Sequence, residues 1–278
     1  MILGVSIAIP ISVFAYSSDD FLRDIGAFQS DLNQSEEEGE RLESDWGAES
    51  AKELFPERSM SGASLSSKRA FEEDKTYVTV RVSGIPVVLR DVPKGEWFAP
   101  FIRDTAEKGI FEGYRDPETG PTGLFGPADN VTIEQVAKIA VTAAGLDASV
   151  CAGSGTLKNV SALDRWSAPF IRCAENSGWA VFSDGSVPVS RSASRSEVVV
   201  TLLQAFHVPV PVATGKRFSD VTSSTEFAGA LEKAASDGIV SGYMDFSGKP
   251  TGTFGPADPV LRAEMAKIIS LAVQLYAR

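Results

Sequence analysis

An internal repeat constrains the fold of this 278-residue chain more than any other feature of its sequence. When the sequence is shifted by 129 positions, the segment that starts at Asp91 aligns without a gap on the segment that starts at Asp220, and about 22 of 49 positions are identical. A third copy lies between them, because the run Trp97–Arg103 recurs with one change as Trp166–Arg172. A single copy is too small to close a hydrophobic core, so the three copies are expected to pack on one another.

Each copy has the pattern of a helix, a loop and a second helix. In the first copy, Pro100 suits a first helical turn and Gly109 stands where a C-terminal cap glycine belongs. A loop rich in glycine and proline follows, and the second helix is expected to begin near Thr132. Thr132 with Gln135 has the spacing of a capping box, as has Ser194 with Glu197 in the second copy. We therefore predict a mainly α fold in which repeats at residues 91–150, 151–212 and 213–278 form a pseudo-threefold bundle.

The chain before the repeats divides into three segments. Residues 1–15 are an apolar run that ends in Val13-Phe14-Ala15, which predicts a signal peptide cleaved after Ala15, although no positively charged region precedes it. A buried N-terminal strand is the alternative. Residues 16–75 are rich in Glu, Asp and Ser and are expected to be a mostly disordered acidic spacer. Residues 76–90 alternate valines with polar side chains, and this pattern predicts a short β ribbon.

The distribution of charge excludes several classes of function. The net charge of −11 is concentrated in residues 19–74, where 16 acidic and 6 basic side chains give −10, so the repeats are nearly neutral. Without a clustered positive field, nucleic acid is not an expected partner. The apolar run at the N-terminus is shorter than the roughly 20 residues that a membrane span needs. One histidine and two cysteines leave few residues for a Ser-His-Asp hydrolase or a Cys/His zinc site, and His207 is expected to have a structural or surface role.

The motifs within the repeats resemble those of S-layer homology modules. The first copy contains Asp91-Val92, Gly109-Ile110, Gly113-Tyr114 and Phe125-Gly126-Pro127, and the third contains the same four motifs from Asp220-Val221 to Phe254-Gly255-Pro256. The resemblance covers residues 90–278. It implies an exported protein that is held non-covalently at the cell surface by an acidic, often pyruvylated, cell-wall polysaccharide bound in grooves between modules.

The chain departs from the family pattern at the start of each second helix. Where the family has Thr-Arg-Ala-Glu, the first copy has Ile133 in place of the arginine, whereas the second and third copies keep Arg195 and Arg262. The third copy also has Leu261 in place of the threonine and Glu226 in place of the tryptophan. At most two of the three grooves are therefore expected to bind a glycan.

Three kinds of side chain make up the expected glycan site. Arg195 and Arg262 stand beside helix N-termini, where the helix dipole and a planar guanidinium suit a ligand carboxylate. Aromatic rings can stack on a sugar, and glycines can let the ligand approach the backbone; the candidates are Trp97, Trp166, Tyr114, Tyr243, Gly113 and Gly242. Core packing is the alternative for the tryptophans, a solvated surface position for the arginines, and a backbone role for the glycines.

Cys151 and Cys173 are an even pair in an apparently exported chain, and we predict that they form a disulfide. No cofactor, metal or catalytic residue is expected, although Asp116, Glu118 and Asp129 flank a loop that can be considered for Ca²⁺. Two rival functions remain. A degenerate triplet can serve protein–protein assembly with other surface-layer proteins, and a glycan hydrolase would need two carboxylates facing across a cleft.

Overall fold

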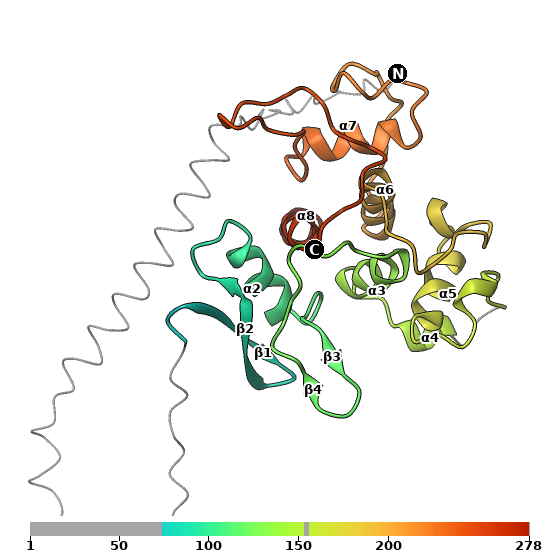
Figure 1. Cartoon of the computed structure of the whole chain (residues 1–278). Helices are drawn as coiled ribbons and strands as arrows, with labels where there is room; N and C mark the ends of the chain where they lie inside the picture. Colours follow the sequence, from blue (N-terminus) through green and yellow to red (C-terminus); the bar gives the residue numbers. More distant parts are fainter. Residues whose placement is uncertain (1–73, 153–155, 278) are drawn as a thin grey trace, which may run out of the picture. The chain divides into compact units, whose positions relative to one another are not determined.

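A computed structural model of the chain describes residues 74–152 and 156–277 (Figure 1). The expected signal peptide and all but the end of the acidic spacer lie outside these residues. The described elements are, in chain order, β1 (Tyr77–Val82), β2 (Ile85–Pro93), α2 (Ala99–Glu107), β3 (Arg115–Asp116), β4 (Gly120–Pro121), α3 (Ile133–Ala143), α4 (Ala148–Ala152), the 3₁₀ turn η1 (Val160–Ala162), α5 (Ala168–Asn176), the 3₁₀ turn η2 (Ala180–Phe182), α6 (Arg195–Ala205), α7 (Ala228–Ser236) and α8 (Arg262–Tyr276). The fold is mainly helical, as predicted.

The β ribbon that precedes the repeats consists of β1 and β2, which pair antiparallel. Val78, Val80 and Val82 are buried and alternate with more exposed residues, which is the predicted pattern for a strand with one face on a core. The ribbon packs against α2. It is longer than expected, since β2 continues to Pro93, and the burial of Val92 explains why the strand does not stop at residue 90.

The first helix of each repeat ends as predicted. Pro100 lies in the first turn of α2, and Gly109 follows that helix with φ +66°. Gly178 and Gly238 stand after α5 and α7 with φ +68° and +76°. A residue with a Cβ adopts this left-handed conformation only with strain, which is why glycine suits the position.

The second helices start at the predicted residues. In α3 the Thr132 side chain accepts a hydrogen bond from the Gln135 backbone N–H while the Gln135 side chain accepts one from the Thr132 N–H. Ser194 and Glu197 make the same two bonds at the start of α6. Both predicted capping boxes are therefore present.

The repeats are held together by contacts between helices of different repeats. The first helix of each repeat packs on a second helix from another repeat: α2 on α8, α5 on α3, and α7 on α6. At the helix starts, the backbone N–H of Val131 donates to Val260 O at 2.9 Å, that of Val260 to Ala193 O at 3.2 Å, and that of Ala193 to Val131 O at 2.8 Å. These three hydrogen bonds form a closed cycle through all three repeats.

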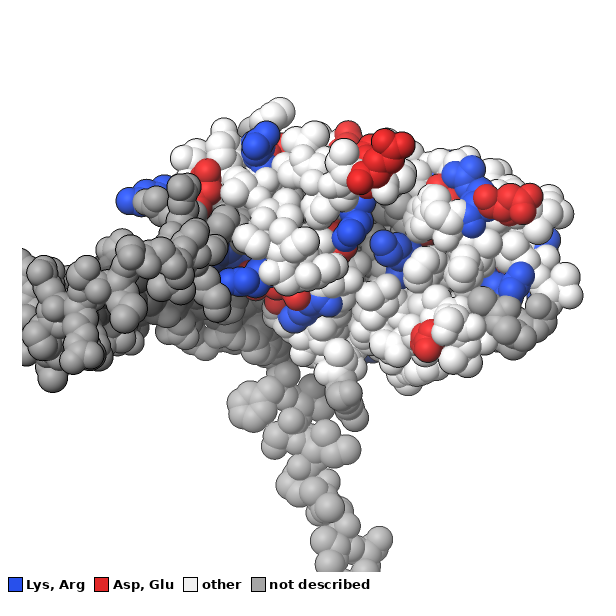
Figure 2. Space-filling model, turned by 90° about the horizontal axis from the view of Figure 1, so that it is seen from below, with Lys and Arg blue, Asp and Glu red and all other residues white. Residues whose placement is uncertain are grey.

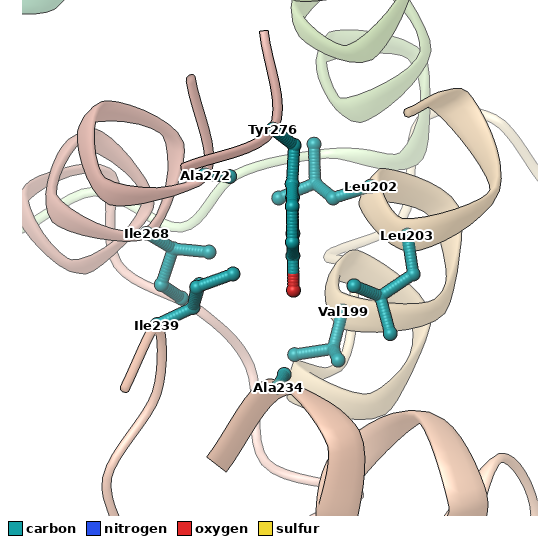
Figure 3. A pocket seen from close by; sticks show the side chains of 8 residues that line it. All are labelled: Val199, Leu202, Leu203, Ala234, Ile239, Ile268, Ala272 and Tyr276. Carbon is teal, nitrogen blue, oxygen red and sulfur yellow. The ribbon is translucent and has the colours of Figure 1, made fainter. Parts of the chain in front are cut away.

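Buried apolar side chains from the ribbon and from all three repeats form one hydrophobic core. A small apolar cavity remains between α6, α7 and α8 (Figure 3). In that view the ring of Tyr276 stands between side chains of α6 on one side and Ile239 and Ile268 on the other. The cavity offers no cluster of polar groups to a ligand, and we assign it to packing.

The sequence did not indicate three features. β3 and β4 form a two-stranded antiparallel sheet within the loop of the first repeat, and α4 and the 3₁₀ turn η1 lie between the first two repeats.

In the described part of the chain, no helix has both the length and the apolar character needed to cross a membrane. On the face drawn in Figure 2, basic and acidic side chains are scattered among uncharged ones.

Candidate functional site

Two equivalent junctions between repeats contain the predicted arginines. We call the place where the start of α8 meets the first-repeat loop the Arg262 junction, and the place where the start of α6 meets the third-repeat loop the Arg195 junction. The backbone N–H of Arg262 donates to Asp129 O at 2.8 Å, and that of Arg195 donates to Asp258 O at 2.9 Å. The equivalent position at the start of α3 is Ile133, and we call its contact with the second repeat the Ile133 junction.

The Arg262 side chain is buried, with 3% of its surface exposed. Its Nε donates to Phe125 O at 2.7 Å, and one terminal nitrogen donates to Glu112 O at 3.3 Å. The guanidinium carbon lies 4.4 Å from the ring centre of Phe111 and 4.5 Å from that of Tyr114, within the range of cation–π interactions. Burial lowers the pKa of Arg262 from its usual value.

The Arg195 side chain has the same arrangement with one addition. Its Nε donates to Phe254 O at 2.9 Å, and its guanidinium carbon lies 5.0 Å from the ring centre of Tyr243. Unlike Arg262, it forms an ion pair, in which a terminal nitrogen lies 3.1 Å from Glu264 Oε1. Both arginines are therefore buried connections between repeats and are not solvated first-turn side chains.

The tyrosines beside these arginines are fixed by aspartates. Tyr114 OH donates to Asp129 at 2.7 Å, and Tyr243 OH donates to Asp258 at 2.8 Å. Burial and the bond to Asp258 together raise the pKa of Tyr243 to about 12, so its hydroxyl stays protonated at neutral pH.

Two further aspartates accept hydrogen bonds from the backbone of the loops in the first and third repeats. The Asp91 carboxylate accepts hydrogen bonds from the backbone N–H groups of Phe125 and Gly126, the latter at 2.7 Å. Asp220 accepts the equivalent bonds in the third repeat, from Phe254 and Gly255. The sequence contained a signal for these contacts, since both aspartates belong to the repeated Asp-Val motif, but their loop-fixing role was not predicted.

The two glycines proposed to let a ligand approach lie close to the loop backbone of their own repeat. A Cβ on Gly113 would lie 2.5 Å from Leu124 O, and one on Gly242 would lie 2.4 Å from Thr253 O. The loop backbone of the same repeat occupies the space that a side chain would need. The backbone role, which was the alternative, therefore accounts for the glycines at these positions, and their contact with a glycan stays a prediction.

The tryptophans are surface residues. Trp97 and Trp166 are 55% and 53% exposed, and each stands two residues before the first helix of its repeat. Core packing, the alternative for them, does not describe these positions. The Lys267 ammonium on α8 lies 6.0 Å from the ring centre of Trp97, and burial lowers its pKa. Lys267 belongs to the repeated Ala-Lys-Ile motif, but its position beside Trp97 was not predicted.

The Ile133 junction is built differently. Ile133 is fully buried, and the next residue, Glu134, accepts hydrogen bonds from Arg165 at 2.7 and 2.9 Å and from Ser167 at 2.7 Å. Burial alone would raise the pKa of Glu134, but the bonds from Arg165 and Ser167 outweigh burial and lower it. An ion pair between the buried Glu134 and the partly exposed Arg165 thus joins the first two repeats where the other junctions have a stacked arginine.

The remaining candidates lie apart from these junctions or serve the loops. Cys151 on α4 and Cys173 on α5 are joined as a disulfide, with Cα atoms 4.8 Å apart. His207 follows α6 with φ +55°. Asp116 accepts hydrogen bonds from the N–H groups of Glu118 and Thr119 in its own turn. Across residues 74–152 and 156–277, no three His, Cys, Asp or Glu side chains are grouped to hold a metal ion.

The comparison with known families agrees with these repeats. A family model of the S-layer homology domain matches residues 89–137, 217–245 and 246–266. The first match covers the first repeat from the end of β2 into α3, and the other two adjoin within the third repeat. The second repeat lies outside the matched segments, and it is also the copy that lacks the Gly-Tyr pair. No curated protein matches the chain.

Proposed function

Because this chain is an S-layer homology domain protein, and such domains are known for anchoring proteins to cell-wall polymers, we propose that it is exported and binds an acidic cell-wall or envelope polysaccharide non-covalently. S-layer homology domains are binding modules and not catalytic ones, so we propose no reaction. Residues 1–15 are proposed to be the signal peptide, in which case N-terminal sequencing of the secreted protein begins at Tyr16. A secreted protein that retains Met1 would contradict this.

We propose that the three repeats form a pseudo-threefold bundle. The closed cycle of hydrogen bonds through Val131, Val260 and Ala193 supports this arrangement. So does the packing of each first helix on a second helix of another repeat, because the same contact then recurs three times around one centre.

The observation that carries the glycan proposal is the exposure of Trp97 and Trp166. Tryptophan side chains are usually mostly buried, so two indoles that are about half exposed are unusual. The flat aromatic face of an indole is a suitable platform for a sugar ring. Lys267 places a positive charge beside the Trp97 ring, which suits a sugar that bears a carboxylate. The buried Arg262 and Arg195 add positive charge behind the loops of their junctions.

Cosedimentation tests this function. The mature chain is mixed with bacterial sacculi that carry a pyruvylated polysaccharide and, as a control, with the same sacculi after removal of that polymer. We expect binding only to the untreated sacculi, and weaker binding by Trp97→Ala and Trp166→Ala. Phe246→Ala is the matched control, since Phe246 is a fully exposed aromatic residue in the third-repeat loop. Equal binding to stripped sacculi would refute glycan anchoring and favour protein–protein assembly with surface-layer proteins.

A further inference from the structure

The two arginine junctions differ in the residue that caps the neighbouring helix. At the Arg195 junction this residue is Glu264, whose carboxylate performs two tasks. One oxygen accepts the N–H of Leu261 at 2.9 Å and caps α8, and the other pairs with Arg195 at 3.1 Å. The second oxygen of the carboxylate therefore neutralises the buried guanidinium.

At the Arg262 junction the equivalent capping residue is Gln135. Its side-chain oxygen accepts the N–H of Thr132 at 3.1 Å, so the cap is preserved. The rest of its amide is an NH₂ group, which donates hydrogen bonds and cannot pair with a guanidinium. Within the described part of the chain, no carboxylate lies within ion-pair distance of Arg262.

Two further differences between the repeats also make the surroundings of Arg262 more positive than those of Arg195. Helix α8 carries Lys267 five residues after Arg262, beside Trp97, whereas α6 carries Val200 five residues after Arg195. The residue equivalent to Trp97 on the α6 side is Glu226, which is exposed and stands two residues before α7. Since α2 packs on α8 and α7 packs on α6, these differences fall on the two corresponding faces.

The other charged groups of the two junctions match. Asp91 and Asp220 fix equivalent loops, and Asp129 and Asp258 accept equivalent tyrosine hydroxyls. The difference in charge between the two junctions is therefore confined to the capping residue and the adjoining helix face. Asp129 and Asp91 act on Arg262 from beyond ion-pair distance. In a region of low dielectric constant, a guanidinium without a directly paired carboxylate acts on an approaching anion more strongly than one in an ion pair.

We propose, on the basis of the function proposed above, that the acidic group of the glycan is received at the face formed by α2 and α8, and that Gln135 determines this preference. The ligand is a sugar that carries a carboxylate. Its ring stacks on Trp97, and its negative charge is attracted by Lys267 and Arg262. The face formed by α6 and α7 bears Glu226, its Arg195 is paired with Glu264 of α8, and it does not take up the acidic group.

Reciprocal exchange of the capping residues tests this inference. Both Gln135→Glu and Glu264→Gln keep a side chain that can cap the helix, so the fold is retained, which circular dichroism checks. The probe for calorimetry is the methyl glycoside of a 4,6-pyruvylated hexose, with the same glycoside lacking the pyruvate as the neutral control. The protein used is the full mature chain.

We expect Gln135→Glu to weaken binding of the pyruvylated probe about tenfold, because the new carboxylate neutralises Arg262. Lys267→Val is expected to weaken it several-fold, and Glu264→Gln to leave it unchanged or to strengthen it. Glu197→Gln is the matched control at the Ile133 junction and is expected to have no effect. The indole N–H signal of Trp97 in NMR spectra should shift with the pyruvylated probe.

The outcomes separate the two proposals. If the wild type binds the pyruvylated probe and Gln135→Glu binds it equally well, the assignment to the α2–α8 face is overturned while glycan anchoring stands. A loss caused by Glu264→Gln instead of Gln135→Glu has the same meaning. If the wild type binds neither the probe nor untreated sacculi, anchoring itself is refuted and the inference is refuted with it.

Discussion

Replacing Arg262 by methionine should destabilise the protein severely, although the arginine stands in the first turn of a helix. The substitution removes the donors to Phe125 O and Glu112 O, and a buried polar group left without a partner costs about 1–3 kcal/mol. Loss of the cation–π contacts with the surrounding rings adds about 0.5–2 kcal/mol. Relief from burying a charge offsets part of this. We expect a net loss of about 3 kcal/mol in the free energy of unfolding.

Thermal unfolding followed by circular dichroism measures the effect. For about 200 folded residues, 3 kcal/mol corresponds to a fall in Tm of about 6–12 °C. Arg262→Lys should fall between the wild type and Arg262→Met, because lysine keeps the charge but lacks the planar set of donors. Arg115→Met is the matched control. Its side chain is 49% exposed and lies 3.7 Å from Glu112, so the change should stay within about 0.5 kcal/mol. Arg262→Met within about 1 kcal/mol of the wild type would refute the reasoning.

Three other predictions concern stability. His207→Gly should stabilise the protein by about 1 kcal/mol in urea titrations, because glycine adopts φ +55° without strain; a destabilised variant would contradict this. Glu134→Gln should be less stable than the wild type at pH 7, and the difference between the two should shrink as the pH falls below about 4.3. The lowered pKa of Glu134 stabilises the fold above about pH 4.3, and this contribution is lost as the pH falls through the folded-state pKa, so parallel pH profiles would disagree with it. Denaturing, non-reducing thiol labelling should find neither Cys151 nor Cys173 free, and reduction should cost about 3 kcal/mol for a separation of 22 residues; two reactive thiols would exclude the bridge.

Local signals in the sequence were sufficient to place the two main helices of each repeat. The capping pair of Thr132 and Gln135 defines where α3 begins, and Gly109 marks where α2 has ended. Such signals involve residues a few positions apart, and their physical effect is exerted on the neighbouring backbone. The repeat then extended the same assignment to the other two copies, including the one that no family model matched.

The surroundings of the arginines could not be predicted in the same way. Arg262 and its acceptor Phe125 are 137 residues apart, and the pattern around Arg262 contains no information about which loop covers it. Considered alone, an arginine in the first turn of a helix is expected to be solvated. Its burial follows from the way the repeats are joined, since the loop of the first repeat supplies both the carbonyl acceptors and the rings.

The same dependence on the neighbouring repeat predicts what happens when an arginine is placed at the remaining helix start. Ile133 is fully buried, and it faces a second repeat that has Val181-Phe182 in place of the Gly-Tyr pair and therefore offers no tyrosine equivalent to Tyr114. The nearby Glu134 is already paired with Arg165. We expect Ile133→Arg to lower the free energy of unfolding by about 3 kcal/mol or more, because a buried guanidinium would lack acceptors, while Ile133→Met changes it by less than about 1.5 kcal/mol. Urea unfolding compares the two variants, and sacculus cosedimentation measures glycan binding. An Ile133→Arg protein as stable as Ile133→Met, with stronger glycan binding, would show that an arginine alone makes a junction competent and that the neighbouring loop does not determine it.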